Sequence, residues 1–443
     1  MQPVWNKLNK FNSLQIFQFL RFGTFFLISI LLAKVAMLYQ HEYGLRLISQ
    51  YENLMLATSS LTFFWVAGIT NTLIPYFNNG DEQVKRKVLF NTFILLLVFS
   101  LVAGIVVAIM GFFHDRDKTL FQMFGLVVIL NTPTYITDYI FYLKGKFKSL
   151  IIWGIVTFGA HILLLCLPLY FKQSLTLGIN LLLVLSLVKF NYTIILLMKY
   201  SSISINKEMI MDFMRKVLPI MFSVLLAGSM DYINSYIVEF KFTDEEFAMF
   251  RYGAKELPIF LILANSLSSV YSGEIAKYNQ EGRLDAGLKR LRKSSQKLMR
   301  WLFPSTIALM FLSPYLFKYA YNEELMAGYK IFNIYLLLII SRMIYPQTVI
   351  MGIMKNKIFY LISSNYLVIN CLLSFWFIYL IGLEGIAYAT VVAYLIEKIM
   401  LAIYCKMQGI DFRKFTPWVE HLVYSLLAIG AFYITTVIEM PMP

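Results

Sequence analysis

The chain has 443 residues, of which 59% are hydrophobic and 14% are charged. Soluble domains contain about 45–50% apolar and about 25% charged residues, and a soluble protein of this length would have to cover its surface with polar groups. The composition therefore excludes a cytosolic enzyme. It predicts a protein whose solvent is lipid, with room for a dozen or more apolar spans of about 20 residues each.

The net charge is strongly positive, with 39 Lys and Arg against 25 Asp and Glu, or +14. In a nucleic-acid-binding protein such an excess would form basic patches with interleaved aromatic residues. Here the basic residues fall mostly in the gaps between long apolar runs, as the positive-inside rule describes. We therefore expect no nucleic-acid partner. The three cysteines lie far apart in apolar runs without CxxC spacing, so neither a disulfide framework nor a metal site is predicted.

Apolar stretches bounded by charges or turn residues predict thirteen transmembrane helices and an all-α, polytopic fold. The thirteenth span is the weakest because it begins near Glu420 and His421, and the number is twelve if that segment lies in the membrane interface. The predicted spans are 17–38, 52–75, 88–113, 119–142, 149–170, 176–199, 214–238, 248–272, 296–318, 328–352, 357–380, 382–405 and 419–438.

Basic residues are distributed unequally between the two sets of alternate gaps. One set holds 25 Lys and Arg, whereas the other holds seven, including two at its edges, and carries acidic runs such as Asp244-Glu245-Glu246. By the positive-inside rule the N-terminus and segment 273–297 are cytoplasmic, and segment 239–247 is external. We expect a multi-pass protein of the cytoplasmic (inner) membrane. An odd number of spans places Pro443 outside.

Segment 281–302 has an amphipathic pattern. Leu284, Leu288 and Leu291 fall near one helical face, and basic residues such as Lys289 and Lys293 face elsewhere. Two interpretations stay open: a helix that lies on an anionic leaflet, or a solvated connector.

Two pairs of similar segments indicate an internal repeat. Phe77-Asn78-Asn79-Gly80 after the second span has a counterpart in Tyr278-Asn279-Gln280-Glu281-Gly282 after the eighth. Glu42-Tyr43-Gly44-Leu45 likewise corresponds to Glu246-Phe247-Ala248-Met249. Corresponding elements lie six spans apart, and because six is even the halves would be parallel repeats. The predicted domains are an N-terminal lobe of six helices at 1–200, a C-terminal lobe of six helices at 201–406 and an extra transmembrane helix within 407–443.

Several short motifs carry a resemblance to a known family. The chain resembles the polysaccharide (O-antigen or exopolysaccharide) flippases, in the superfamily that also contains the multidrug and toxin extrusion transporters and the lipid II flippase. The resemblance covers about residues 10–405 and implies a V-shaped pair of lobes around a central cavity. It also implies that an undecaprenyl-diphosphate-linked oligosaccharide moves from the cytoplasmic to the outer leaflet. The motifs are Glu42-Tyr43-Gly44-Leu45, Leu218-Pro219, Asp231-Tyr232 and Phe250-Arg251-Tyr252-Gly253-Ala254-Lys255-Glu256-Leu257.

Ionisable groups inside the spans are the natural site candidates, because burying one costs at least about 2.5–3.5 kcal/mol unless it faces a partner or water. We interpret Arg21 and Lys398, which lie near span ends, as residues whose long side chains snorkel toward the membrane interface. Lys189 and Arg342 lie nearer the middle of their spans. The groups are Arg21, Lys34, Lys189, Arg251, Lys255, Arg342 and Lys398, with the acidic Asp138, Asp231, Glu256 and Glu397.

The cationic excess of this set suits an anionic cargo, because a diphosphate needs compensating charge when it leaves water. The alternative is that the cations only pair with Asp138, Asp231 and Glu397. Asp231 and Lys255 fall at similar depth in a predicted hairpin, where they would form either an exchangeable gate or a structural bridge. The substrate-binding candidates are Lys34, Lys189, Arg251, Lys255 and Arg342, and the coupling or gating candidates are Asp138 and Asp231.

Three function classes compete. A flippase for a lipid-linked oligosaccharide comes first, with membrane lipids and an optional coupling proton or sodium ion as further partners. A cation-coupled multidrug or small-solute antiporter would be expected to offer a carboxylate in its cavity, whereas the first span has Lys34. A membrane polymerase or acyltransferase would need an acid–base or nucleophilic constellation. His161 is a single histidine within the fifth predicted span, and we interpret it as a buried residue that donates a hydrogen bond inside the helix bundle. We therefore predict no catalytic residues and no cofactor.

Overall fold

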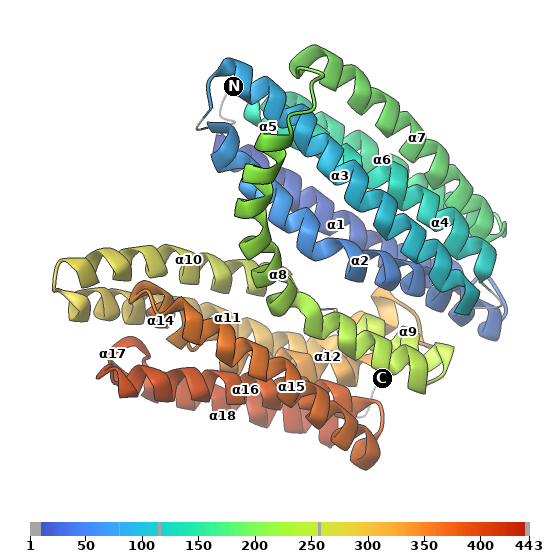
Figure 1. The fold of residues 1–443 in the computed structure, drawn as a ribbon. Helices are drawn as coiled ribbons and strands as arrows, with labels where there is room; N and C mark the ends of the chain where they lie inside the picture. Colours follow the sequence, from blue (N-terminus) through green and yellow to red (C-terminus); the bar gives the residue numbers. More distant parts are fainter. Residues whose placement is uncertain (1–9, 79, 114–116, 256–257, 439–443) are drawn as a thin grey trace, which may run out of the picture. The chain divides into compact units, whose positions relative to one another are not determined.

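The computed structural model of this protein describes residues 10–78, 80–113, 117–255 and 258–438 (Figure 1). That part of the chain is almost entirely helical and contains no β-strand. Glu256 and Leu257 of the last motif lie outside the described residues, as do Lys7 near the N-terminus and Pro443. Contacts divide the chain into two compact units, Met1–Gly228 and Ser229–Pro443, here called unit 1 and unit 2.

The described residues of unit 1 form seven complete helices and the first part of α8. Its α3 begins at a capped N-terminus, where the Asp81 carboxylate accepts a hydrogen bond from the Val84 N–H. The helices are α1 (Lys10–Ala36), α2 (His41–Asn78), α3 (Glu82–Met110), α4 (Lys118–Asn131), α5 (Tyr135–Leu143), α6 (Phe147–Tyr170), α7 (Leu175–Tyr200) and α8 (Lys207–Lys241), with 3-10 turns η2 (Gly111–Phe113) and η3 (Thr132–Thr134).

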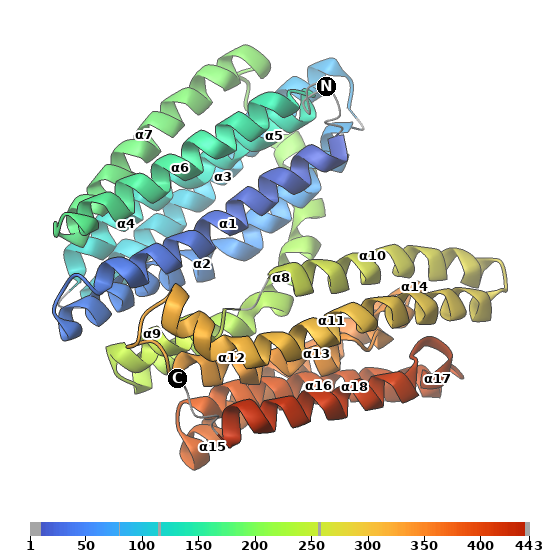
Figure 2. The same cartoon turned by 180° about the vertical axis from the view of Figure 1, so that it is seen from behind.

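Unit 2 begins inside α8 and contains the remaining helices, seen from the opposite side in Figure 2. They are α9 (Asp244–Gly253), α10 (Pro258–Gln280), α11 (Leu284–Ala320), α12 (Gly328–Leu336), α13 (Leu338–Arg342), α14 (Pro346–Gly352), α15 (Asn356–Ile381), α16 (Glu384–Met407), α17 (Phe412–Phe415) and α18 (Trp418–Phe432), which continues into the π-turn η4 (Tyr433–Val437).

The division between the units falls inside α8, whereas the sequence analysis divides the lobes at 200/201, before α8. The N-terminal part of α8 packs on α2. Tyr76 donates a hydrogen bond to the Asp212 carboxylate over 2.8 Å, and Gly68 lies close to Met221. These contacts assign the first half of α8 to unit 1.

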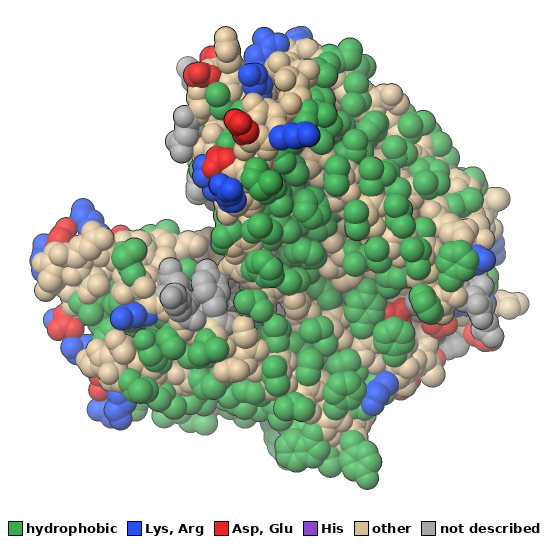
Figure 3. All heavy atoms as spheres, in the orientation of Figure 1, with side chains coloured by type: hydrophobic (Ala, Val, Ile, Leu, Met, Phe, Trp, Pro, Cys, Tyr) green, Lys and Arg blue, Asp and Glu red, His purple; other side chains and the backbone are tan. Residues whose placement is uncertain are grey.

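The prediction of an all-α, polytopic membrane protein is confirmed. Among the described residues, nine helices are long and apolar enough to cross a membrane, or ten if the bent pair 328–342 and 346–352 is one span. Segment 418–437 is among the nine. Three predicted spans have no counterpart among the nine: 214–238, which corresponds to α8, 248–272, which corresponds to α9 and α10, and 296–318, which corresponds to α11. Hydrophobic side chains cover much of the face shown in Figure 3.

Prolines interrupt three predicted spans. The predicted 119–142 is divided into α4, η3 and α5 at Pro133, and 328–352 bends by 42° before Pro346. The predicted span 248–272 is wrong as one helix, because α9 ends at Gly253 and α10 begins at Pro258. Proline lacks the backbone donor of a continuing helix and disfavours helical geometry at the preceding residue.

The amphipathic segment 281–302 is the first part of α11, a continuous helix of 37 residues. Leu288, Leu291 and Met299 are buried, while Lys289 and Lys293 on the other face are exposed. The segment therefore continues directly into the predicted span 296–318. The choice between an anionic leaflet and water for its basic face stays open.

Helices α3 and α4 cross at two glycines. A Cβ atom on Gly104 would lie 2.5 Å from the carbonyl oxygen of Gly125, and the reverse distance is the same. Ser100 donates a hydrogen bond to the Ile129 carbonyl across this crossing. Small residues let membrane helices approach closely. This close packing stabilises the association of the helices in a bilayer, where lipid tails provide no hydrophobic driving force for it.

Gly104→Leu should therefore separate α3 from α4 and destabilise unit 1 by about 1–3 kcal/mol or more, since overpacking forces backbone shifts. Gly159→Leu is the matched control, because no atom lies within 4 Å of a Cβ at that position. Thermal unfolding of the purified protein measures the effect. Equal melting temperatures for the two variants would contradict the role of the crossing.

Topology provides a second prediction. In a background without Cys166, Cys371 and Cys405, a cysteine at Glu281 should react only from the cytoplasm and one at Glu245 only from outside. Both positions are exposed, whereas Ser295 in the same predicted cytoplasmic segment is buried. Labelling of intact cells with an impermeant maleimide measures this. Labelling at position 281 in intact cells would reverse the assigned orientation.

Candidate functional site

Unit 1 holds a charged cluster between its helices, formed by Arg21, Asp138 and Lys189 and here called the unit 1 cluster. Asp138 on α5 is buried, with 9% of its surface exposed, and it interacts electrostatically with both cations. Its Oδ1 accepts a hydrogen bond from Trp153 Nε1 over 3.0 Å. One carboxylate therefore neutralises part of the charge of two cations.

The break at η3 positions this cluster. Arg21 of α1 stacks on Tyr135, the first residue of α5, with its guanidinium carbon 4.2 Å from the ring centre. Lys189 of α7 donates a hydrogen bond to Oδ1 of Asn131, the last residue of α4, over 2.6 Å. Each cation is therefore held by a residue directly beside the interruption.

Two predicted candidates of unit 1 differ in their relation to the cluster. Asp138 and Lys189 belong to it, whereas Lys34 lies 13 residues beyond Arg21 on α1, about 20 Å along the helix axis. Arg21 is in the set of charged residues inside the predicted spans, but the sequence analysis interprets it as a snorkelling residue and leaves it out of the substrate-binding and coupling candidates. Its spacing from Asp138 in sequence gives no signal of their contact.

His161 on α6 lies near the cluster and interacts electrostatically with Lys189. Its ring packs edge-on against Phe25, with the ring centres 6.3 Å apart. The Nε2 atom is buried and makes no hydrogen bond to the described part of the chain, so this histidine is not the satisfied core donor that the sequence analysis expects.

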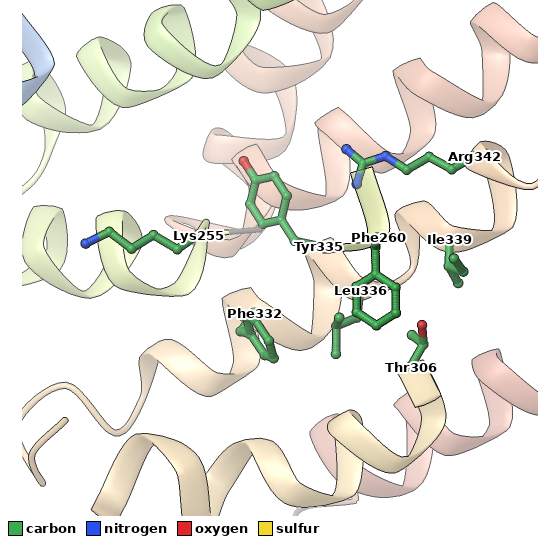
Figure 4. A pocket seen from close by; sticks show the side chains of 8 residues that line it. All are labelled: Lys255, Phe260, Thr306, Phe332, Tyr335, Leu336, Ile339 and Arg342. Carbon is green, nitrogen blue, oxygen red and sulfur yellow. The ribbon is translucent and has the colours of Figure 1, made fainter. Parts of the chain in front are cut away.

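Unit 2 contains a pocket lined by two of the predicted substrate-binding cations, here called the unit 2 pocket. Lys255 and Arg342 approach it from different elements, and Tyr335 lies between them in the view of Figure 4. The Lys255 ammonium lies 4.1 Å from the centre of the Tyr252 ring. The pocket is lined by Lys255, Phe260, Thr306, Phe332, Tyr335, Leu336, Ile339 and Arg342.

A buried ion pair lies next to this pocket. Glu397 and Lys398 of α16 are each 6% exposed, and Lys398 Nζ lies 3.5 Å from Glu397 Oε2. Lys398 also lies near Tyr394, as does Arg342, with cation-to-ring-centre distances of 5.1 Å and 5.8 Å. The interpretation of Lys398 as a snorkelling residue is wrong, because the packing of α16 buries its ammonium.

Arg251 and Asp231 lie at the contact of α9 with α8. Arg251 donates a hydrogen bond to Ser235 Oγ over 3.1 Å, one helical turn after Asp231, whose side chain is exposed. Arg251 and Lys255 are four residues apart within the predicted span 248–272, a spacing that predicts one helix face, but α9 ends at Gly253 and Lys255 follows that end. The exchange between Asp231 and Lys255 stays a prediction.

In the described part of the chain, both sites place two or more cations between helices, an arrangement that can bind an anion. The unit 1 cluster combines Arg21 and Lys189 with Asp138, and the unit 2 pocket is lined by Lys255 and Arg342, with the Glu397–Lys398 pair close to Arg342. Among the described residues, no group of three or more His, Cys, Asp or Glu could hold a metal ion.

In sequence, the chain matches no family model and no curated protein. In structure, it is similar to the lipid II flippase MurJ in an inward closed conformation, with a TM-score of 0.66 and 15% identity over 96% of this chain and 93% of that one. It is also similar to an inward-facing multidrug resistance MATE family transporter of the MOP superfamily, with a TM-score of 0.56 and 12% identity over 86% and 94%. The MATE multidrug transporter DinF-BH gives a TM-score of 0.53 and 14% identity over 89% and 95%. The chain therefore has the fold of the MOP-superfamily transporters.

The unit 1 cluster yields a stability prediction. Asp138→Asn should destabilise unit 1 by about 3–5 kcal/mol, because it leaves Arg21 and Lys189 without their carboxylate. Adding Lys189→Gln should restore part of the loss. Asp212→Asn is the control, since it breaks an exposed pair with Lys216 whose contribution is about 0–1 kcal/mol.

Thermal unfolding of the four proteins measures these differences. A melting temperature for Asp138→Asn equal to that of Asp212→Asn would contradict the shared-carboxylate arrangement, as would a double variant less stable than Asp138→Asn.

Proposed function

We propose that this protein is a flippase that moves an undecaprenyl-diphosphate-linked oligosaccharide across the cytoplasmic membrane by alternating access, during the biosynthesis of a surface polysaccharide. The observation that carries the proposal is the presence of cations inside the helix bundle of each unit, at Arg21 and Lys189 in the unit 1 cluster and at Lys255 and Arg342 in the unit 2 pocket. Each such cation costs free energy to bury, and an anionic head group would offset that cost during transport.

The chemistry of the cations supports a phosphate-bearing substrate. Arg342 can pair with two phosphate oxygens at once, while Lys189 and Lys255 act as point charges. The apolar residues of the unit 2 pocket, such as Phe260 and Phe332, lower the local dielectric and strengthen this attraction. The fold shared with a lipid II flippase adds support from architecture.

The membrane potential would drive the proposed reaction in the correct direction. Outward movement of a diphosphate with about two negative charges across an inside-negative membrane is favourable by roughly 2.3 kcal/mol per charge per 100 mV. A coupling proton or sodium ion is therefore not required, and the residues bind and position the substrate without forming or breaking a covalent bond.

A second candidate is a cation-coupled multidrug antiporter. The buried Asp138 carboxylate favours it, because a membrane-embedded carboxylate can bind a proton or sodium ion. Similarity to MATE multidrug transporters supports the same reading. Proteoliposomes loaded separately with a fluorescent undecaprenyl-diphosphate oligosaccharide and with a cationic dye distinguish the two functions.

Under the flippase proposal, Lys189→Gln and Arg342→Gln should each reduce flipping of the labelled oligosaccharide lipid by about 10-fold to 100-fold. This corresponds to about 1.5–3 kcal/mol for a charge-assisted hydrogen bond. Lys199→Gln is the control, because Lys199 lies exposed at the end of the same helix as Lys189.

Loss of fluorescence after addition of a membrane-impermeant quencher reports flipping, and size-exclusion chromatography reports folding. If the variant with both Lys189→Gln and Arg342→Gln flips the lipid at the wild-type rate, neither residue belongs to the proposed substrate-binding site. Transport of the dye but not of the oligosaccharide lipid would favour the antiporter.

A further inference from the structure

Helix α11 has one continuous exposed face, and the chemistry of this face changes at Trp301. Before that residue the face carries Lys289, Lys293 and Lys297, which are one helical turn apart and all exposed. From Trp301, which is 76% exposed, to Leu312, which is 55% exposed, the helix contains no charged residue. The exposed face therefore passes from basic to apolar within one turn of the helix.

A second tryptophan lies at a similar depth on the neighbouring helix α18 (Figure 2). Arg300, the residue before Trp301, forms an ion pair of 3.0 Å with Glu420, two residues after Trp418. Trp418 is 41% exposed. Tryptophan is enriched at membrane–water interfaces, where its amphipathic ring lies at the level of the lipid head groups. The two tryptophans therefore mark the plane at which these helices of unit 2 enter the head-group layer.

The rise of an α-helix gives the distance of each lysine from this plane. At 1.5 Å per residue, Lys297, Lys293 and Lys289 lie about 6, 12 and 18 Å from Trp301 along the helix axis. The head-group layer is about 5–7 Å thick on each side of the bilayer. Lys297 therefore lies in this layer and Lys293 lies directly above it, within a Debye length of about 10 Å, whereas Lys289 lies beyond that length.

The charge of Lys293 and Lys297 is not neutralised within the described part of the chain. Neither residue forms an ion pair with a described residue, and like charges one turn apart on a helix repel each other. Lys289 differs, because it affects the Asp285 carboxylate electrostatically. The carboxylates nearby form ion pairs with other cations: Glu274 with Arg290, Asp285 with Lys414 and Glu420 with Arg300.

We propose that Lys293, Lys297 and Trp301 form a binding site for the head group of an anionic phospholipid, which in the predicted topology belongs to the cytoplasmic leaflet. The anionic phosphate neutralises the two lysines and relieves their repulsion. The Trp301 ring packs at the boundary between head group and acyl chain. A zwitterionic lipid gains less, because it brings its own cationic group close to the lysines. The site does not depend on what the protein transports.

Fluorescence quenching next to the site tests this proposal. In a background without the three native cysteines, Ser305→Cys, which is exposed one turn after Trp301, carries a thiol-reactive fluorophore. The full chain is placed in nanodiscs of phosphatidylcholine with a minority of phosphatidylglycerol, and one lipid or the other carries a quenching nitroxide on its acyl chain. Comparison of the two quenching efficiencies gives the local enrichment of phosphatidylglycerol. We expect at least about 5-fold enrichment, which corresponds to about 1 kcal/mol for one lysine near an anionic surface.

Two variants of the labelled protein separate the local charge from other effects. Lys293→Gln with Lys297→Gln should abolish the enrichment, and because glutamine is a good helix former the helix is retained. Lys289→Gln is the matched control, since it makes the same change farther from the head groups, and it should alter the enrichment by less than about 2-fold. Added salt should weaken the enrichment in the labelled protein without these substitutions, because it screens exposed charges.

Three results would overturn the inference. They are a labelled protein without enrichment, an enrichment that persists in the double variant or at high salt, and an equal loss in Lys289→Gln. The first of these would assign the lysines to water or to an acidic protein segment. The proposed transport function stands in every case, because the assay measures lipid composition at one position and not flipping.

Discussion

The low dielectric of the bilayer is the constraint on which the rest of this structure depends, because an ionised or polar group inside it needs an internal partner. Asp138 accepts a hydrogen bond from Trp153, and Glu397 accepts one from Ser363, each with a cation close by. Neutral residues follow the same rule. Asn234 of α8 donates to Thr390 of α16, and two further buried side chains of α15 extend this network. Polar contacts of this kind connect helices that lipid-like apolar packing alone would hold weakly.

The interruptions of the helices are where this constraint allows irregular backbone, since freed backbone groups are tolerated only where protein surrounds them. Pro133, Thr132 and Thr134 at the break between α4 and α5 are all buried. The bend before Pro346 is likewise enclosed, with Tyr345 1% exposed. Both interruptions occur beside a charged group, at Asp138 and at Arg342. At a helix end, backbone groups without a partner in the helix can interact with a buried charge, as can the side chains of the turn. In a continuous helix the backbone groups are already hydrogen-bonded.

The two units accommodate the cations between their helices in different ways. In unit 1 the cations are fixed by specific neutral partners, since Arg21 stacks on Tyr135 and Lys189 donates to Asn131. In unit 2 the cations Lys255 and Arg342 line a pocket, and the carboxylate lies one layer behind them. The first arrangement favours stability of the helix bundle, and the second favours an exchangeable anion. The proposed function would use both arrangements, because rigid packing positions the groups that a substrate must reach.

The sequence by itself determined that this protein lies in lipid, that it is all-α and which charged residues its spans contain. Hydropathy and charge are properties of each segment alone. It also located Asp138, Lys189 and Arg342 as candidates. Tertiary structure decided which of them meet. Arg21 and Lys398 looked like snorkelling residues from their position near span ends, and only the packing of neighbouring helices placed Arg21 beside Asp138 and buried Lys398 together with Glu397. The division of the eighth span and the position of Lys255 beyond α9 were also decided there. The rotation of a helix about its axis and the identity of its neighbours depend on contacts between distant segments, which hydrophobic periodicity does not specify.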